Sequence, residues 1–337
     1  MTKLTALRLA TGLGTLLLGR ALIRRRRHLD LRDKVVVITG GSRGLGLVLA
    51  RELVRKGARV AICARDAAEL ERARVELAIV GGTVHAAPCD VTDRDDITRF
   101  LTEVHDELGP IDVLFNNAGI IQVGPVEMMN LEDYERAMRT HLWAPLYAML
   151  AVLPEMRRRG SGRVVNITSI GAKLAIPHLV PYCASKFALY GLSSGMRTEL
   201  AQDGVFITTV CPGLMRTGSP RHAIVKGQAQ AEYAWFDITD SSPVTSMNAE
   251  RAARQIIRAC EHGDAEVVLS LQGRLAAKAH ALAPNLVQEA LAVVARLMPS
   301  SEGGSRVGVE GKDAESALAP SVWTAWGDAA ARRNNEV

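Results

Sequence analysis

The chain has 337 residues, of which 48% are hydrophobic and 23% charged, as in a folded globular protein and unlike a disordered chain. Its net charge of +5 is local, because residues 1–34 carry +7 and the remainder −2, so nothing favours nucleic acid as a partner of the folded body. The five cysteines form no CxxC pair and have no histidine at ligand spacing, which fits neither a disulfide framework nor a metal site. Reduced thiols indicate a cytoplasmic localisation.

The N-terminal segment combines an apolar run with a basic cluster. Leu4–Ile23 is long enough to cross a bilayer as a helix, but Arg8 and Arg20 interrupt it. Arg24–Arg27 follows directly and would bind anionic headgroups. We expect a helix that associates with a membrane surface through residues 4–27, with a true span and a cytosolic or disordered arm as alternatives.

From Lys34 onward, short β-branched runs alternate with longer helical patterns, which predicts an α/β fold. We expect a doubly wound, Rossmann-type parallel sheet of seven strands with helices on both faces. The predicted strands are Val35–Thr39, Arg59–Cys63, Thr83–Ala87, Ile111–Phe115, Gly162–Thr168, Phe206–Val210 and Glu266–Leu269. The predicted helices are Leu45–Lys56, Ala67–Val80, Arg94–Leu108, Leu131–Glu155, Tyr182–Ala201 and Ala249–Cys260.

This pattern divides the chain into an N-terminal segment, residues 1–32, a doubly wound Rossmann-type domain, residues 33–274, and a helical extension, residues 275–337. Residues 214–247 break the alternation just after a strand, where such sheets bind ligands, so we expect a substrate lid there. In the extension, Leu275–Met298 is predicted to be helical and divided at Pro284, residues 300–315 to be disordered, and the segment with Trp323 and Trp326 to form a short docking helix.

Between the first strand and its helix lies the loop Thr39-Gly40-Gly41-Ser42-Arg43-Gly44-Leu45-Gly46. Glycines let the backbone approach a pyrophosphate closely, and the N-terminus of a helix favours its negative charge. A tight turn between strand and helix is the alternative interpretation. The loop does, however, follow a predicted strand and open a predicted helix, as a nucleotide site requires.

The end of the second strand indicates which dinucleotide is bound. Ala64-Arg65 stands where an acidic residue would contact a ribose 2′-hydroxyl, and Arg43 lies in the nearby glycine loop. Two guanidinium groups could bind one 2′-phosphate, so NADP(H) is preferred. Asp66 keeps NAD(H) as an alternative, and the two arginines could also be plain solvated charges.

Further motifs follow in order: Cys89-Asp90-Val91, Asn116-Asn117-Ala118-Gly119, Ser169, Tyr182-Cys183-Ala184-Ser185-Lys186 and Pro212-Gly213. With the glycine loop, they make residues 32–270 resemble the short-chain dehydrogenase/reductase family. The resemblance implies a homo-oligomer, and it assigns cofactor binding to Gly40, Ser42, Arg43, Gly44, Leu45, Gly46, Arg65, Asp90, Val91, Asn117, Ala118, Gly119, Tyr182, Lys186, Pro212, Gly213 and Thr217.

Three side chains indicate the chemistry. Tyr182 and Lys186 are four residues apart on a predicted helix and hence share one face. A neighbouring ammonium should lower the pKa of the phenol and let Tyr182 act as general acid and base. Ser169 would hydrogen-bond the substrate oxygen, where charge develops. Each residue alone has an ordinary structural interpretation, but together with the glycine loop they indicate hydride transfer between an alcohol and a carbonyl.

His141 departs from the family pattern, which commonly has asparagine there to hold a water molecule for proton relay. An imidazole could bind that water or relay the proton itself, so we place His141 among the catalytic candidates. Helix packing is the alternative.

The predicted function is therefore an NADP(H)-dependent oxidoreductase that interconverts a carbonyl and a secondary alcohol. The lid offers apolar side chains such as Leu214, Trp235 and Phe236, so a lipophilic small molecule is the expected substrate. One alternative is a weakly active nucleotide-binding scaffold or redox sensor, which only His141 favours. An epimerase or dehydratase of the extended branch of the family is disfavoured by the spacing of the glycine loop.

Overall fold

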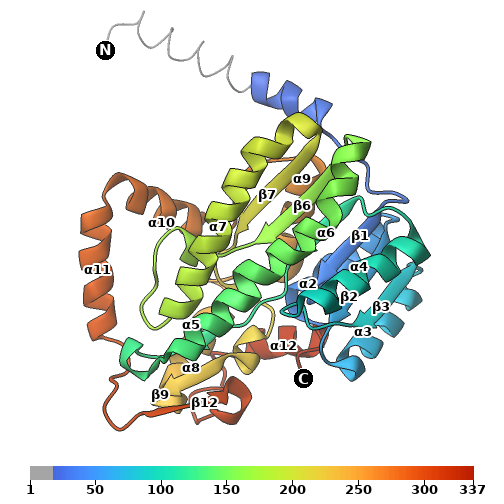
Figure 1. Cartoon of the computed structure of the whole chain (residues 1–337). Coiled ribbons are helices and arrows are strands. Elements are labelled where there is room, and N and C mark those ends of the chain that lie inside the picture. The colour runs from blue at the N-terminus through green and yellow to red at the C-terminus, as the bar shows by residue number, and fades with distance from the viewer. Residues whose placement is uncertain (1–17) are drawn as a thin grey trace, which may run out of the picture.

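The computed structural model describes residues 18–337, and a parallel seven-stranded sheet lies at the centre of this part of the chain (Figure 1). The strand order is β11-β7-β6-β4-β1-β2-β3. The strands are β1 (Val35–Thr39), β2 (Arg59–Ala64), β3 (Val84–Pro88), β4 (Val113–Asn116), β6 (Gly162–Ile167), β7 (Val205–Cys211) and β11 (Glu266–Val268). The predicted fold class is confirmed.

Helices cover both faces of the sheet. Those on one face are α2 (Gly44–Arg55), α3 (Ala67–Ile79) and α9 (Ala249–Glu261), and those on the other are α4 (Arg94–Leu108), α6 (Ala144–Arg159) and α7 (Val180–Leu200). In β1, Val36 and Ile38 pack on the first face and Val35 and Val37 on the second. This double coverage explains why the central strands are apolar throughout instead of alternating with polar residues.

The strand order reverses at β1, which pairs with β2 on one side and β4 on the other. Next to β4 lies β6, so the carboxyl ends of β1, β4 and β6 are neighbours at one edge of the sheet. In open α/β sheets a crevice forms at such a reversal, because the connecting helices pass to opposite faces. The glycine loop follows β1, the loop with Asn117 follows β4, and the loop with Ser169 follows β6.

The predicted helix Leu131–Glu155 contains a wider turn. It consists of α5 (Leu131–Met138), a π-helical turn η2 (Arg139–Trp143) and α6. Asn130 starts α5 with a capping box, in which its side chain accepts from Asp133 N and the Asp133 carboxylate accepts from Asn130 N. His141 lies in the π-helical turn, a type of distortion that often occurs at functional sites.

The predicted lid has regular structure of its own. It contains β8 (Met215–Arg216), η5 (Ser219–His222), β9 (Ile224–Gly227), α8 (Ala229–Ser241) and the first residue of β10 (Met247–Asn248). β9 is the middle strand of a second sheet, between β5 (Gln122–Val123) and β12 (Ser305–Glu310). The prediction of disorder for residues 300–315 is therefore wrong at β12, because β9 supplies backbone partners that the local composition does not reveal.

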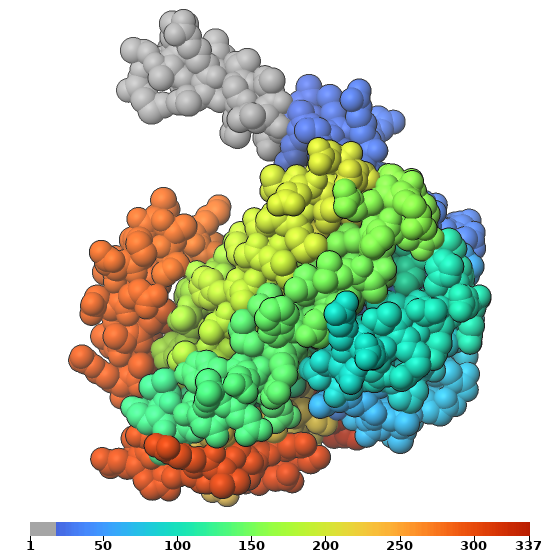
Figure 2. Space-filling model, in the orientation of Figure 1, coloured from blue at the N-terminus to red at the C-terminus, as the bar shows by residue number. Residues whose placement is uncertain are grey.

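The helical extension follows the prediction in part. Helices α10 (Leu271–Leu282) and α11 (Pro284–Arg296) are divided just before Pro284, and in Figure 2 they stand out from the body as an orange projection. The short helix α12 (Ala325–Arg333) forms as well. It docks through buried small residues such as Gly327 and Ala331, whereas Trp323 and Trp326 are 70% and 63% exposed.

At the other end, residues 18–26 are helical, and most of the predicted membrane segment lies outside the described residues. Within residues 18–337, no helix has both the length and the apolar character needed to cross a membrane.

The packing of the core predicts that replacing two different isoleucines lowers the free energy of unfolding by very different amounts. Ile257 on α9 is fully buried, and Ile79 at the end of α3 is 82% exposed. We expect Ile257→Ala to lower the free energy of unfolding by about 2–5 kcal/mol, because it leaves a cavity against the sheet, and Ile79→Ala to lower it by less than about 0.5 kcal/mol. Urea denaturation followed by circular dichroism measures both, and equal losses would contradict this packing of α9.

Candidate active site

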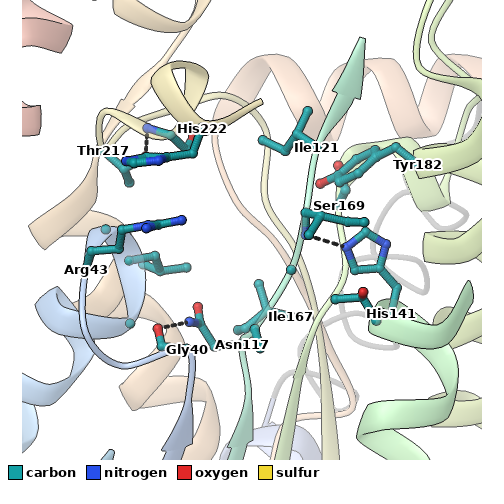
Figure 3. A pocket seen from close by; sticks show the side chains of 18 of the residues that line it. Gly40, Arg43, Asn117, Ile121, His141, Ile167, Ser169, Tyr182, Thr217 and His222 are labelled. Atoms are coloured by element: carbon teal, nitrogen blue, oxygen red, sulfur yellow. Dashed lines mark hydrogen bonds between the residues drawn. The ribbon is translucent and has the colours of Figure 1, made fainter. Parts of the chain in front are cut away.

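A cavity of about 1220 Å³ opens at the carboxyl ends of β1, β4 and β6. Every site residue predicted from the sequence lines it: Gly40, Ser42, Arg43, Gly44, Leu45, Gly46, Arg65, Asp90, Val91, Asn117, Ala118, Gly119, His141, Ser169, Tyr182, Lys186, Pro212, Gly213 and Thr217. In Figure 3, Arg43, Thr217 and His222 lie on one side, and Ser169, Tyr182 and His141 lie opposite them. The cavity is large enough for a dinucleotide and a small substrate.

The glycine loop fits tightly against the strand ends. A Cβ on Gly46 would lie 2.0 Å from the carbonyl oxygen of Gly40, and Gly40 itself has a φ of +64° with the Ala118 backbone beside it. Asn117 Nδ2 donates to the carbonyls of Thr39 (3.1 Å) and Gly40 (3.0 Å). The loop is thus held close to the β4 loop, and the N-terminus of α2 faces the cavity, as an anion site requires.

Of the two arginines predicted to select the nucleotide, Arg43 has acidic neighbours. Arg43 Nη1 lies 2.7 Å from Glu69 Oε1, and the Ser42 hydroxyl donates to Glu69 Oε2 at 3.2 Å. Asp66 caps α3, since its carboxylate accepts from Glu69 N at 2.8 Å. Arg65 lines the cavity with an exposed side chain, and no ion-pair partner for it occurs in residues 18–337.

The three residues predicted for the chemistry come together. Ser169 follows β6, and its hydroxyl accepts from Gly171 N at 3.0 Å. Lys186 on α7 is buried, donates to the Ile167 carbonyl at 3.0 Å and holds its Nζ 5.6 Å from the centre of the Tyr182 ring. The helical spacing of Tyr182 and Lys186 therefore directs both side chains to the end of β6.

The sequence predicts that the pKa of Tyr182 is lowered, and for the protein by itself this prediction is wrong. Burial raises the pKa of the phenol to about 12, and a hydrogen bond with Ser169 opposes this only in part. The sequence does not show burial, and in this site the cost of placing a phenolate in apolar surroundings outweighs any effect of the nearby ammonium. The phenol is therefore protonated at pH 7, although burial makes it a weaker acid than a free tyrosine.

Burial also acts on Lys186, whose pKa it lowers to about 7. The side chain therefore changes charge near neutral pH instead of remaining a permanent cation.

Both ring nitrogens of His141 have partners inside the protein. Nε2 accepts from Ile120 N at 3.1 Å, so the hydrogen is assigned to Nδ1, which lies 2.7 Å from the Ser185 hydroxyl. The ring packs edge-on against Tyr182 with centroids 5.4 Å apart. Burial lowers the pKa of the imidazole well below its usual value, and the nearby Lys186 adds to this.

Two acidic residues that the sequence did not predict also line the cavity. Asp240 on α8 is 4% exposed, its Oδ2 has no hydrogen-bond partner in the described chain, and burial raises its pKa well above the usual value. Glu336 reaches the cavity from beyond α12. Neither belongs to a local motif, because the folding of the lid and of the extension alone brings them to the cavity.

A family model described as short chain dehydrogenase matches residues 34–226. The chain belongs to the short-chain dehydrogenases. Gluconate 5-dehydrogenase from Gluconobacter oxydans is 38% identical over 181 residues, which cover 54% of this chain and 71% of that protein. Like the family, this protein is an oxidoreductase that acts on alcohol or carbonyl groups of a small molecule with a nicotinamide cofactor.

Solved structures of short-chain dehydrogenases share the fold. One from Streptomyces avermitilis matches with a TM-score of 0.68 and 30% identity, covering 78% of this chain and 97% of that one. An actinorhodin polyketide ketoreductase variant with NADPH matches with a TM-score of 0.64 and 29% identity, covering 70% of this chain and 95% of that one.

The ionisation of Lys186 predicts a pH dependence. The ammonium predominates below pH about 7 and is lost above it, so kcat/KM for the reduced cofactor in carbonyl reduction should fall as the pH rises through about 7. Lys186→Arg, which stays charged, should remove this fall whatever its absolute activity. Initial rates between pH 6 and 9 test the prediction, and a level profile in the parent protein would contradict it.

Proposed function

We propose that this short-chain dehydrogenase is an NADP(H)-dependent carbonyl reductase and alcohol dehydrogenase. The observation that carries the proposal is the position of Ser169, Tyr182 and Lys186 in one cavity, facing the glycine loop. A hydride donor seated on that loop would extend toward these side chains. The weakly active scaffold is not favoured, since His141 is accommodated by hydrogen bonds to Ile120 and Ser185 that leave the three residues in place.

Each side chain has one role in reduction. The bound cofactor supplies the hydride. The Ser169 hydroxyl donates a hydrogen bond to the carbonyl oxygen, and the neutral phenol of Tyr182 gives that oxygen its proton. The Lys186 ammonium, fixed on the Ile167 carbonyl, stabilises the phenolate that remains. We assign His141 a positioning role against Tyr182, since neither of its nitrogens is left for a proton relay.

Removing one phenolic oxygen tests this assignment. We expect Tyr182→Phe to lower kcat for carbonyl reduction by a factor of about 10²–10⁴, because the proton donor is lost while the ring remains. Binding of NADPH should persist. Tyr190→Phe is the matched control, since Tyr190 lies on the same helix and its hydroxyl donates to Glu266 at the surface. Turnover in Tyr182→Phe equal to that in Tyr190→Phe would rule the mechanism out.

The preference for NADP(H) is supported by the end of β2. The Asp66 carboxylate caps α3 by accepting a hydrogen bond from Glu69 N. The exposed Arg65 lines the cavity without an ion-pair partner in residues 18–337. Arg43, although it contacts Glu69, lines the same cavity. The solved ketoreductase with NADPH is consistent with this choice.

Replacing Arg65 should therefore separate the two cofactors. We expect Arg65→Gln to raise KM for NADPH by about tenfold, because one charge-assisted contact to the 2′-phosphate is lost, and to leave KM for NADH unchanged. Arg94→Gln, at the exposed start of α4 and outside the cavity lining, is the control. Equal changes for NADPH and NADH would contradict the assignment of Arg65.

A lipophilic substrate is supported by the wall of the cavity around Tyr182. Side chains there include Ile176, Leu179, Leu214, Trp235 and Phe236. They would exclude water from a carbonyl at Tyr182 and favour an apolar body on the substrate. Contact of residues 4–27 with a membrane surface and assembly into a homo-oligomer remain predictions.

A further inference from the structure

The segment that follows α12, residues 334–336, is fixed on the glycine loop. Asn334 is fully buried, and its carbonyl accepts from Gly44 N at 2.9 Å. Arg51 Nη1 donates to Asn334 Oδ1 at 2.9 Å, and Asn335 Nδ2 donates to the Ser42 carbonyl at 2.9 Å. The first N–H of helix α2 is therefore occupied by the protein's own chain.

Next in this segment, Glu336 places a carboxylate at the N-terminus of α2. The side chain is 3% exposed and lines the cavity, and Oε1 lies 2.5 Å from where a Cβ on Gly44 would be. Oε2 lies 3.3 Å from Arg43 Nε and 3.1 Å from His222 Nε2, although no donor is aligned to hydrogen-bond it. Figure 3 shows Arg43, His222 and Thr217 on the same side of the cavity.

The features that hold this carboxylate are the ones that a cofactor pyrophosphate needs. The N-terminus of a helix and a nearby guanidinium favour any anion, whether it belongs to the protein or to a ligand. A pyrophosphate bound there would bring two further negative charges beside a buried carboxylate. Repulsion between such charges is strong where water is scarce, so the two anions compete for the position.

We propose that residues 334–336 form an internal competitor for the cofactor, in which Glu336 occupies the pyrophosphate position and must leave it when the cofactor binds. The inference rests on the proposed function, because it requires a nicotinamide dinucleotide on the glycine loop. Only the segment beyond Arg333 needs to move, because α12 can stay packed on α8 through Gly327. A segment docked about nine-tenths of the time weakens the apparent affinity roughly tenfold.

Glu336→Gln removes the charge and retains the size of the side chain. Isothermal titration of NADPH and of NADH into the full chain should give Kd values about five- to tenfold lower than in the parent protein for both cofactors. Glu302→Gln is the matched control, since Glu302 is exposed and lies outside the cavity lining, and it should leave both values unchanged. A variant that stops after Arg333 should act in the same direction as Glu336→Gln.

Unchanged or weaker binding in Glu336→Gln would overturn the inference and make the segment a fixed wall of the site. A gain confined to NADPH would also overturn it, because the repulsion would then act on the 2′-phosphate. The measurement needs no turnover. A protein that binds both cofactors more tightly after Glu336→Gln, yet reduces no carbonyl, would refute the proposed function and leave this inference standing.

Discussion

The hydrogen bond from Lys186 Nζ to the Ile167 carbonyl is the interaction on which the site depends. A buried ammonium needs an acceptor, and the end of β6 supplies one. This contact holds α7 against the sheet, and because Tyr182 lies one helical turn before Lys186, it also sets the phenol beside Ser169. The same burial that keeps the phenol protonated moves the ionisation of the amine to near-neutral pH.

The topology of the sheet joins this group to the nucleotide site. β6, β4 and β1 are neighbours, so loops far apart in the sequence meet at their carboxyl ends. The glycine loop after β1 and the Asn117 loop after β4 form the floor, and the Ser169 loop after β6 reaches the opposite side. The residues for catalysis and for cofactor binding thus line one cavity, although they come from loops and helices that are far apart in the sequence.

Local and non-local features differed in how well the sequence predicted them. The apolar run of β1, the glycine loop and the spacing of Tyr182 and Lys186 are local, and the structure has them as predicted. Strand β12 depends on pairing with β9, and Glu336 reaches the glycine loop only because α12 docks on the lid, so neither left a local signal. The raised pKa of Tyr182 has no local signal in the sequence either, since burial is a property of the whole fold.

The central claim is that a hydride reaches the substrate carbon while Tyr182 protonates its oxygen. Reduction of a ketone with NADPH that carries deuterium at the transferring C4 position tests it most directly. Mass spectrometry of the alcohol should find one deuterium bound to the carbinol carbon. Alcohol without deuterium, formed while the labelled cofactor is consumed, would contradict the account.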